Sequence, residues 1–269
     1  MRFSIAKSFC PGALVAALVT APMQAQNVQN VHNFVVSPAG DANGQCTEER
    51  PCSPQGAVDA CPMGEICNIA LQHGVYEDPA INMYYHRTIT MTGDCNDPHA
   101  VVFRATKPNT ALVWVQDHVT AGLSCLTLDS VATGTTGIAA RQHAIADYVS
   151  IVFGQFSEGT HILVNELSIA SCMSKAWISG SAKSHVVASY LSKINLGCAV
   201  DFPQRVQIDI FATAGLFSVI DAASARFTGA GADGVRCANN MAAIIEPTDG
   251  QSFPGTSGEC KQPSMPQQR

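Results

Sequence analysis

A short apolar strand pattern recurs about every 20 residues between residues 110 and 247, and no other feature constrains the fold as strongly. One series of such segments covers residues 110–116, 136–142, 160–166, 175–181, 197–204 and 216–221. A second series lies between them, at residues 124–130, 148–154, 167–171, 185–189 and 207–211. Two strands in each repeat of this length are typical of a solenoid whose coils stack on one another.

The segments alternate, as in ValSerIleValPhe and GlnIleAspIlePhe, so successive side chains point to opposite faces of a strand. Glycines and small hydroxyl residues recur between the segments, where the chain has to turn from one face to the next. The competing architecture is a β-sandwich, which favours tight two-residue hairpins. Between adjacent strand segments the only such signals are Asn43–Gly44 and Asp233–Gly234, so an all-β, single-stranded parallel solenoid is the favoured fold class.

Residues 1–25 have the pattern of a secretory signal peptide. Arg2 and Lys7 give a positive start, residues 13–19 are an unbroken apolar run, and Ala25 is a small residue before the expected cleavage site. A membrane anchor is the alternative, but the run is about half of the ~20 residues that a spanning helix needs. We therefore expect a secreted or periplasmic protein with no transmembrane anchor after processing.

Cleavage would remove Cys10 and leave ten of the 11 cysteines, an even number that suggests disulfide bonds in an exported chain. Free cysteines stacked in the core are the alternative. A zinc site is not indicated, because the chain has no CxxC pair and its histidines are scattered along the sequence. Spacing favours pairs that are local or one coil apart, namely Cys46 with Cys52, Cys61 with Cys67, Cys95 with Cys125, Cys172 with Cys198, and Cys237 with Cys260.

The predicted solenoid domain covers residues 26–248. Near its start, Ser53 as an N-cap and Pro54 at the first helical position predict a short helix. A solenoid exposes the apolar cross-section of its first coil, so an amphipathic helix at this end would act as a cap. Residues 249–269 are rich in Gln, Ser, Pro and Gly, and they predict a flexible C-terminal tail, with Cys260 as an attachment point to the last coil.

Seven short segments of the N-terminal part resemble the cap and first coil of a known superfamily. They are ValValSer (35–37), GlyAspAlaAsnGly (40–44), ProCysSer (51–53), AlaValAspAla (57–60), IleAlaLeu (69–71), GlyValTyr (74–76) and IleThrMetThrGly (89–93). Together with the later strand pattern they resemble the right-handed parallel β-helix proteins of the pectate-lyase superfamily, over residues 32–247. This resemblance implies the fold, a right-handed parallel β-helix with a short N-terminal capping helix. It does not imply one activity, because members include lyases, hydrolases, epimerases and non-catalytic proteins.

The resemblance also says how activity would have to be built. Members similar to polygalacturonases use three neighbouring aspartates, including an Asp-Asp pair, with Gly-His-Gly and Arg-Ile-Lys motifs, and this sequence contains none of these motifs. Members similar to pectate lyases hold calcium with clustered carboxylates and use an arginine or lysine as the base. Calcium would therefore be the cofactor if the chain were a lyase, and otherwise no cofactor is indicated.

Stacking the coils would bring the ends of the first strand series along one edge, about 5 Å apart. That edge would carry Gln116–Asp117, Arg141–Gln142–His143, Asn165–Glu166, Ser181–Lys183 and Gln204–Arg205. Asp117, Arg141, His143 and Glu166 are the candidate binding residues, as an acid/base or cation-binding patch. The alternative is an ordinary polar corner with solvated charges. Similarly, Trp114 and Trp177 are either platforms for sugar rings or half-buried strand residues.

Charge limits the partners. Removal of Arg2 and Lys7 with the signal peptide changes the net charge from −6 to −8, and no basic face for nucleic acid is visible. Links between strands are mostly short, whereas a catalytic groove needs long loops on one face. We therefore expect an exported protein that binds extracellular polysaccharide or a surface partner without strong catalysis. A polysaccharide lyase or glycoside hydrolase of the pectate-lyase type is the alternative.

Overall fold

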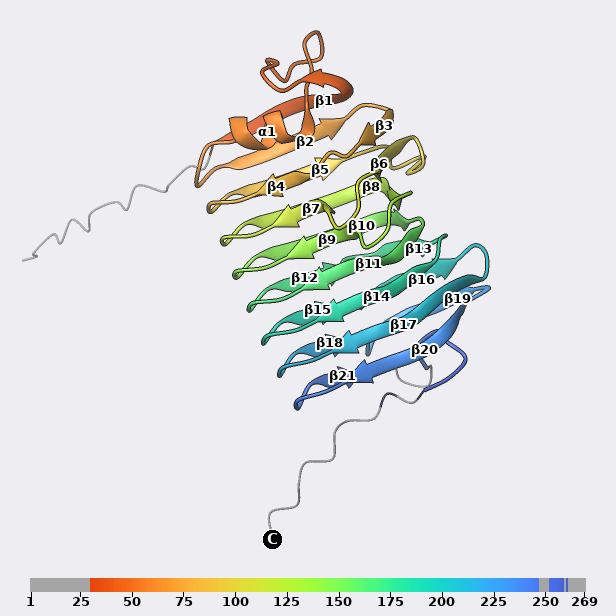
Figure 1. Ribbon diagram of the computed structural model, residues 1–269. Helices are drawn as coiled ribbons and strands as arrows, with labels where there is room; N and C mark the ends of the chain where they lie inside the picture. Colours follow the sequence, from red (N-terminus) through yellow and green to blue (C-terminus); the bar gives the residue numbers. More distant parts are fainter. Residues whose placement is uncertain (1–29, 247–251, 259, 261–269) are drawn as a thin grey trace, which may run out of the picture.

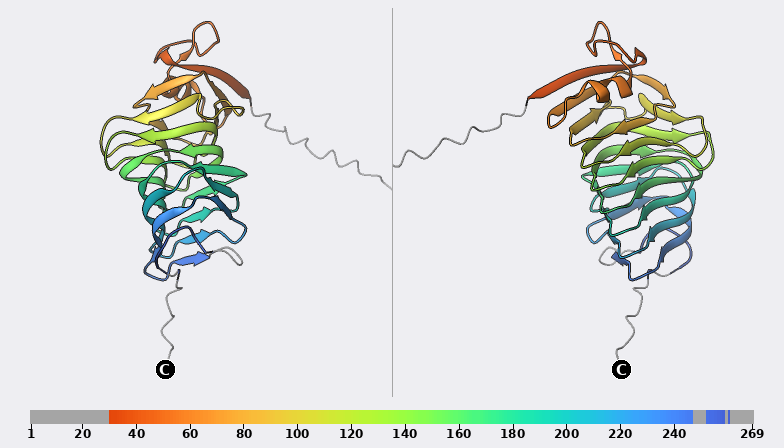
Figure 2. Two further views of the ribbon diagram at one scale, coloured as in Figure 1. Left: turned by 90° about the vertical axis from the view of Figure 1, so that its right-hand side faces the viewer. Right: turned by 60° about the vertical axis from the view of Figure 1, so that its left-hand side comes forward.

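The computed structural model describes residues 30–246, 252–258 and 260, and these residues form a right-handed β-solenoid with one short helix (Figure 1). Every strand pair in the described part is parallel, so the β-sandwich alternative is excluded and the predicted fold class is confirmed. The coils stack into a column with the N-terminal cap at one end (Figure 2). The expected signal peptide lies outside the described residues.

Each complete coil has three faces, and the strands at the same place in successive coils pair with one another. Face 1 contains β1 (Val31–Asp41), β2 (Ile66–Leu71), β5 (Thr88–Thr92), the first parts of β8 (Thr120–Ser130) and β10 (Ile145–Phe153), β12 (Ile169–Cys172), β15 (Lys193–Asn195), β18 (Val219–Asp221) and β21 (Ile244–Glu246). Face 2 contains β3 (Gly74–Glu77), β6 (Val101–Ala105), the second parts of β8 and β10, β13 (Lys175–Ile178), β16 (Ala199–Phe202) and β19 (Arg226–Gly229). Face 3 is a seven-stranded sheet of β4 (Ile81–Met83), β7 (Ala111–Val115), β9 (Thr136–Ala140), β11 (Phe156–Val164), β14 (Ala182–Ala188), β17 (Val206–Ala214) and β20 (Ala232–Asn239).

Three faces make the repeat longer than the sequence pattern predicts. On face 3, Val113 pairs with Ile138, which pairs with Ile162, and hydrogen bonds between neighbouring coils link residues 24, 25 or 26 positions apart. The expected series with two strands per repeat is therefore wrong after residue 166. Residues 175–178 and 199–202 lie on face 2, and 219–221 on face 1, because a third strand enters each coil between the two that the pattern suggested.

The inward positions repeat from coil to coil and form one continuous core. Val113, Ile138, Ile162, Val186 and Ala212 follow one another in register on face 3, and each is fully buried. Burial of this kind contributes about 1.5–3 kcal/mol for each large aliphatic side chain. A coil cannot bury these side chains alone, which is why the stacked arrangement is the stable one.

A two-residue turn joins face 3 to face 1 in each coil, and the stacked turns form one edge of the column, here called the turn ridge. Both turn residues have positive φ in all seven turns, namely 85–86, 117–118, 142–143, 166–167, 190–191, 216–217 and 241–242. Backbone hydrogen bonds run between the turns, for example from His118 N to Gln142 O at 3.2 Å. The repeated backbone conformation keeps every turn in register with the next.

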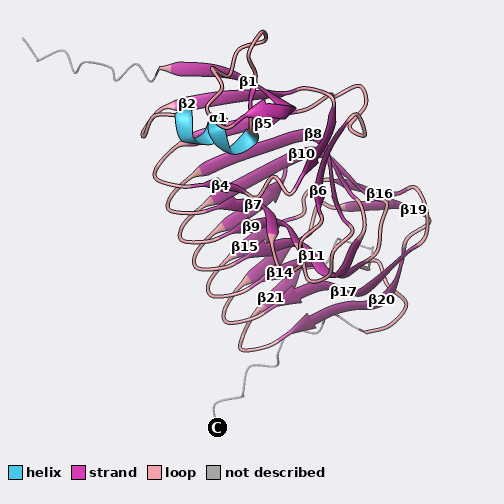
Figure 3. Cartoon of the chain, turned by 45° about the horizontal axis from the view of Figure 1, so that its top comes forward, coloured by secondary structure: helices cyan, strands magenta, loops and turns pink. Residues whose placement is uncertain are grey.

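The N-terminal end is capped by α1 (Pro54–Ala60), as the sequence predicts (Figure 3). Ser53 Oγ accepts a hydrogen bond from the Gly56 N–H, and Pro54 occupies the first turn of the helix. Gln55 accepts from the Asn82 backbone N–H at 2.7 Å and donates to the Asn82 carbonyl at 3.3 Å. The helix therefore covers the open edge of β4, which is the first strand of face 3.

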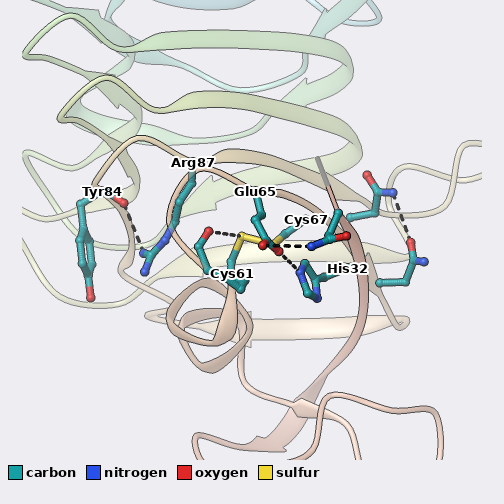
Figure 4. The surroundings of a disulfide bond; sticks show 10 residues. His32, Cys61, Glu65, Cys67, Tyr84 and Arg87 are labelled. Carbon is teal, nitrogen blue, oxygen red and sulfur yellow. Dashed lines mark hydrogen bonds and ion pairs between the residues drawn. A yellow bond between two sulfur atoms is a disulfide. The ribbon is translucent and has the colours of Figure 1, made fainter. Parts of the chain in front are cut away.

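The cysteines join in the five pairs that their spacing favours: Cys46–Cys52, Cys61–Cys67, Cys95–Cys125, Cys172–Cys198 and Cys237–Cys260. Figure 4 shows Cys61–Cys67, which ties the end of α1 to β2, beside the pair formed by His32 Nε2 and Glu65 Oε2. These bonds suit an oxidising compartment. In the part of the chain that the structure covers, no helix has the length and apolar character to cross a membrane.

Residues 252–258 and 260 lie against the last coil. Phe253 is 1% exposed and contacts the rings of Phe211 and Phe227, at centroid distances of 5.7 and 5.8 Å. Ser257 forms a parallel bridge with Val235. This part of the expected tail thus packs as a cap over the end of the core, and the rest of it lies outside the described residues.

Candidate functional site

Three of the four candidate residues lie in the turn ridge, in consecutive coils. Asp117 and Glu166 are first turn residues and His143 is a second turn residue, whereas Arg141 lies between the end of β9 and its turn. His143 N donates to Glu166 O at 3.1 Å, so the two residues are in adjacent turns. The structure therefore brings all four to one edge of the column.

Arg141 is held by its neighbours on face 3 and not by the candidate acids. Its Nε donates to Gln116 Oε1 at 2.7 Å, and its guanidinium lies 4.7 Å from the centre of the Trp114 ring. Within the described residues no ion pair joins any two of the four candidates. The arrangement does not supply a proton-transfer pair, because an acid and a base have to converge on one point to act together.

The expected continuation of this edge is wrong. Ser181–Lys183 and Gln204–Arg205 lie at the corner between faces 2 and 3, before β14 and β17 reach the turn ridge. Tyr190 and Leu216 occupy the turns that follow Glu166. The physical reason is the third strand of each coil, which shifts these residues by one corner. The beginning of the edge has an open hollow of about 420 Å³, lined by Asn82, Tyr84, Tyr85, Gln116 and Asp117.

A better-formed hollow lies on face 2. It has a volume of about 350 Å³, and its lining is Asn96, Asp97, Pro98, His99, Val152, Trp177, Ser179, Asp201 and Pro203. A volume of this size is within the range of small-ligand sites. The lining combines one large aromatic ring with two carboxyl groups and one imidazole, so it joins an apolar surface to hydrogen-bonding groups.

The floor of this hollow is a row of outward side chains on face 2. Val152, Trp177 and Asp201 follow one another in register across β10, β13 and β16. The Trp177 ring is half-buried, and Lys175 Nζ lies 4.4 Å from its centre. Thr228, the next residue of the row, donates to Asp201 Oδ1 at 3.0 Å and orients that carboxylate.

The wall is the loop of residues 94–100, and several bonds fix it in place. The disulfide Cys95–Cys125 ties it to β8, and Thr127 Oγ1 donates to Pro98 O at 2.9 Å. Inside the loop, Asp97 Oδ1 accepts from the His99 backbone N–H at 3.0 Å. A wall that is already ordered loses little conformational entropy when a ligand binds.

At the start of the loop, Asp94 accepts the Asn96 backbone N–H at 2.9 Å and contacts His73 Nε2 at 2.9 Å. Both contacts favour the ionised carboxylate, the backbone N–H most strongly, and the pKa of Asp94 is therefore below its usual value. Asp94 stays negative at neutral pH and strengthens the turn that begins the wall.

The sequence suggests Trp177 as a platform, but it does not show which residues surround the ring. Asp97 and His99 are far from Trp177 in the sequence, and Asp201 lies on a different strand. The signal was the cysteine at position 95, because its bond to Cys125 holds the loop over face 2. Both tryptophan rings carry a cation, Arg141 over Trp114 and Lys175 over Trp177, and Trp177 is the one that lines the hollow on face 2.

No protein-family model matches the chain, and no curated protein matches it. Among solved structures the chain is similar to Escherichia coli YbhC, with 13% identity, a TM-score of 0.45, and coverage of 98% of this chain and 84% of that chain. At this identity and this TM-score, the likeness carries no argument about the site. The class of protein therefore comes from the chain itself, a disulfide-linked parallel β-solenoid with a walled hollow on one face.

Proposed function

We propose that this protein is an exported glycan-binding β-solenoid, and that it binds extracellular polysaccharide in the hollow on face 2. The observation that carries the proposal is the Trp177 ring on the floor of this hollow, beneath the fixed loop 94–100. The face of an indole ring is electron-rich, and it attracts the weakly positive C–H groups of a sugar ring.

The groups around the ring suit the hydroxyls of a sugar. Asp97 and Asp201 carry carboxylate acceptors, and His99 can donate or accept through its imidazole. A site with one apolar platform and a few polar groups is the usual design of a small-ligand site. The hollow lies on the side of a column, so a long chain can extend past it along the stacked coils.

Export is part of the proposal. It rests on the signal-peptide pattern of residues 1–25 and on the pairing of all the remaining cysteines in disulfides. N-terminal sequencing of the protein from culture medium and from the periplasm tests it. A chain that begins after Ala25 in either fraction is the expected result, and an uncleaved cytosolic chain contradicts export.

Binding is tested with the mature protein on an array of polysaccharides and oligosaccharides, followed by titration calorimetry with the best ligand. Trp177→Ala should weaken binding by about 5- to 30-fold, since stacking of one aromatic ring contributes on the order of 1–2 kcal/mol. Trp114→Ala is the matched control, because it removes the other tryptophan and leaves the hollow intact. Equal loss in both variants, or no loss in Trp177→Ala, contradicts the proposed site.

One observation favours a second candidate function, a polysaccharide lyase or hydrolase. Asp97, His99 and Asp201 line one hollow, so groups able to transfer protons lie near a platform for the substrate. Incubation with plant and bacterial polysaccharides, followed by chromatography of the products, tests it. Product formation that is lost in both Asp97→Asn and Asp201→Asn would favour an enzyme over a binding protein.

A further inference from the structure

Three histidines of the turn ridge form a ladder in consecutive coils. The ring of His118 lies 4.7 Å from that of His86 and 4.9 Å from that of His143, measured between centroids. The planes differ by 14° in the first pair and by 3° in the second. These residues are 32 and 25 positions apart in the sequence, and only the stacking of the coils brings them together.

The backbone holds the three side chains in register. Each histidine is the second residue of its turn and has positive φ, between 47° and 63°. Its backbone N–H donates to the carbonyl of the first turn residue in the next coil, at 3.1 to 3.2 Å. All three side chains are exposed. Leu167 takes the next place on the ridge, so the ladder ends at His143.

We propose that this histidine ladder is a binding site for a divalent transition-metal ion of the kind that imidazole prefers, such as Cu²⁺ or Zn²⁺. Neutral imidazole nitrogens are good ligands for these ions. The site is separate from the hollow on face 2, and the inference does not depend on glycan binding.

The length of a metal–nitrogen bond limits how far apart two ligating histidine nitrogens can be. A zinc–nitrogen bond is about 2.0–2.1 Å long, so two imidazole nitrogens on one ion are at most about 4.2 Å apart. The in-plane lone pairs of two stacked rings do not point at one ion, so at least one ring of a pair has to turn toward the other, and exposed side chains change rotamer readily. His118 is the central residue and can pair with either neighbour.

The ladder supplies two or three imidazole ligands and does not form a complete coordination shell. Over the described ranges no set of three His, Cys, Asp or Glu side chains is already arranged around one point. Water and the carboxylate of Asp117, the residue before His118, are available for the remaining positions. We therefore expect one bound ion for each chain, with an affinity set mainly by His118.

The test is titration calorimetry of untagged mature protein with CuCl₂ or ZnCl₂ alone. His118→Asn is the informative variant, because asparagine tolerates the positive φ of this position and the turn stays intact. We expect one ion for each wild-type chain and at least about tenfold weaker binding in His118→Asn. His73→Asn, which removes an exposed histidine away from the ridge and outside the lining of the hollow, should bind metal as the wild type does.

A second readout separates metal binding from a change in folding. Saturating metal should raise the melting temperature of the wild type and of His73→Asn clearly more than that of His118→Asn, while all three melt alike without metal. Two results would overturn the proposal. One is no binding by the wild type up to a concentration on the order of 1 mM, and the other is equal affinity in the wild type and His118→Asn.

Discussion

The Nδ1 atoms of His161 and His185 lie 2.9 Å apart in the core, on adjacent strands of face 3. His161 Nε2 donates to Gly154 O at 3.3 Å, so its Nδ1 is the acceptor and the Nδ1–H of His185 is the donor. Both rings are neutral in this arrangement, and both contact Phe153.

This pair should make the protein sensitive to mild acid. Burial lowers the pKa of His161 to about 3 and holds the pKa of His185 well below its usual value. The unfolded chain takes up these protons below about pH 6.5, whereas the folded chain does not. The free energy of unfolding should therefore be flat above pH 7 and fall below about pH 6.5, by up to about 1.4 kcal/mol per pH unit for each histidine. Urea unfolding between pH 8 and pH 5 measures it.

The double variant His161→Phe/His185→Phe is the control for this prediction. It removes both titrating groups together and leaves no unpaired nitrogen in the core, so its stability should change little between pH 6.5 and pH 5. Carboxylates with lowered pKa values, such as Asp78 and Asp233, lose their contribution only at lower pH. An equal slope in the wild type and the double variant would assign the acid sensitivity to other groups.

Removal of the disulfide between Cys95 and Cys125 should weaken ligand binding as well as stability. The bond closes a loop with a sequence separation of 30, which corresponds to about 3–4 kcal/mol of loop-closure entropy. The variant Cys95→Ala/Cys125→Ala frees the wall of the hollow, and calorimetry with the identified glycan should show weaker binding. Cys237→Ala/Cys260→Ala is the comparison, because it releases the C-terminal cap, and there binding should persist while stability falls.

Loss of the Phe253 ring should destabilise the last coil. The side chain is 1% exposed and packs on two other phenylalanine rings, so Phe253→Ala should cost about 3–5 kcal/mol in the free energy of unfolding. Chemical denaturation followed by circular dichroism measures this loss. Phe217→Ala, at a turn-ridge position that is 62% exposed, should change stability by less than about 0.5 kcal/mol. Similar effects of the two substitutions would mean that residues 252–258 do not cap the core in solution.

The turn ridge should not support degradation of polygalacturonate. Arg141 is engaged by Gln116 and Trp114, and the motifs of the hydrolase branch are missing from the sequence. Purified mature protein, assayed with and without calcium, should give no strong release of unsaturated or reducing ends. Robust turnover that disappears in both Asp117→Ala and Arg141→Ala would overturn the interpretation as a binding protein.

The solenoid could be predicted because its cause is local and repeated. Alternating apolar residues, such as those of residues 148–153, bury one side of a strand in any context that supplies a neighbour. The pairing of Cys172 with Cys198 follows from the same repeat, since residues one coil apart lie side by side. The short helix at Pro54 could be predicted because its N-cap and first-turn proline are local signals.

Which face of the solenoid each strand of the later coils belongs to could not be predicted in this way. The residues between 167 and 221 fit two strands per repeat as well as three, because the strands of faces 1 and 2 are short and equally apolar. Positive φ at Cys125 and Ser150 bends β8 and β10 from one face to the next, and no glycine marks either bend. Register therefore depended on pairing between coils, which is a tertiary property.

By itself, the sequence determined that this chain stacks short strands around one apolar core and closes its N-terminal end with a helix, because burial and backbone capping act over a few residues. Only the tertiary structure decided which distant side chains meet. It placed Asp97 and Asp201 beside Trp177, and His118 between His86 and His143, because the exact length of each coil sets which residues share a position.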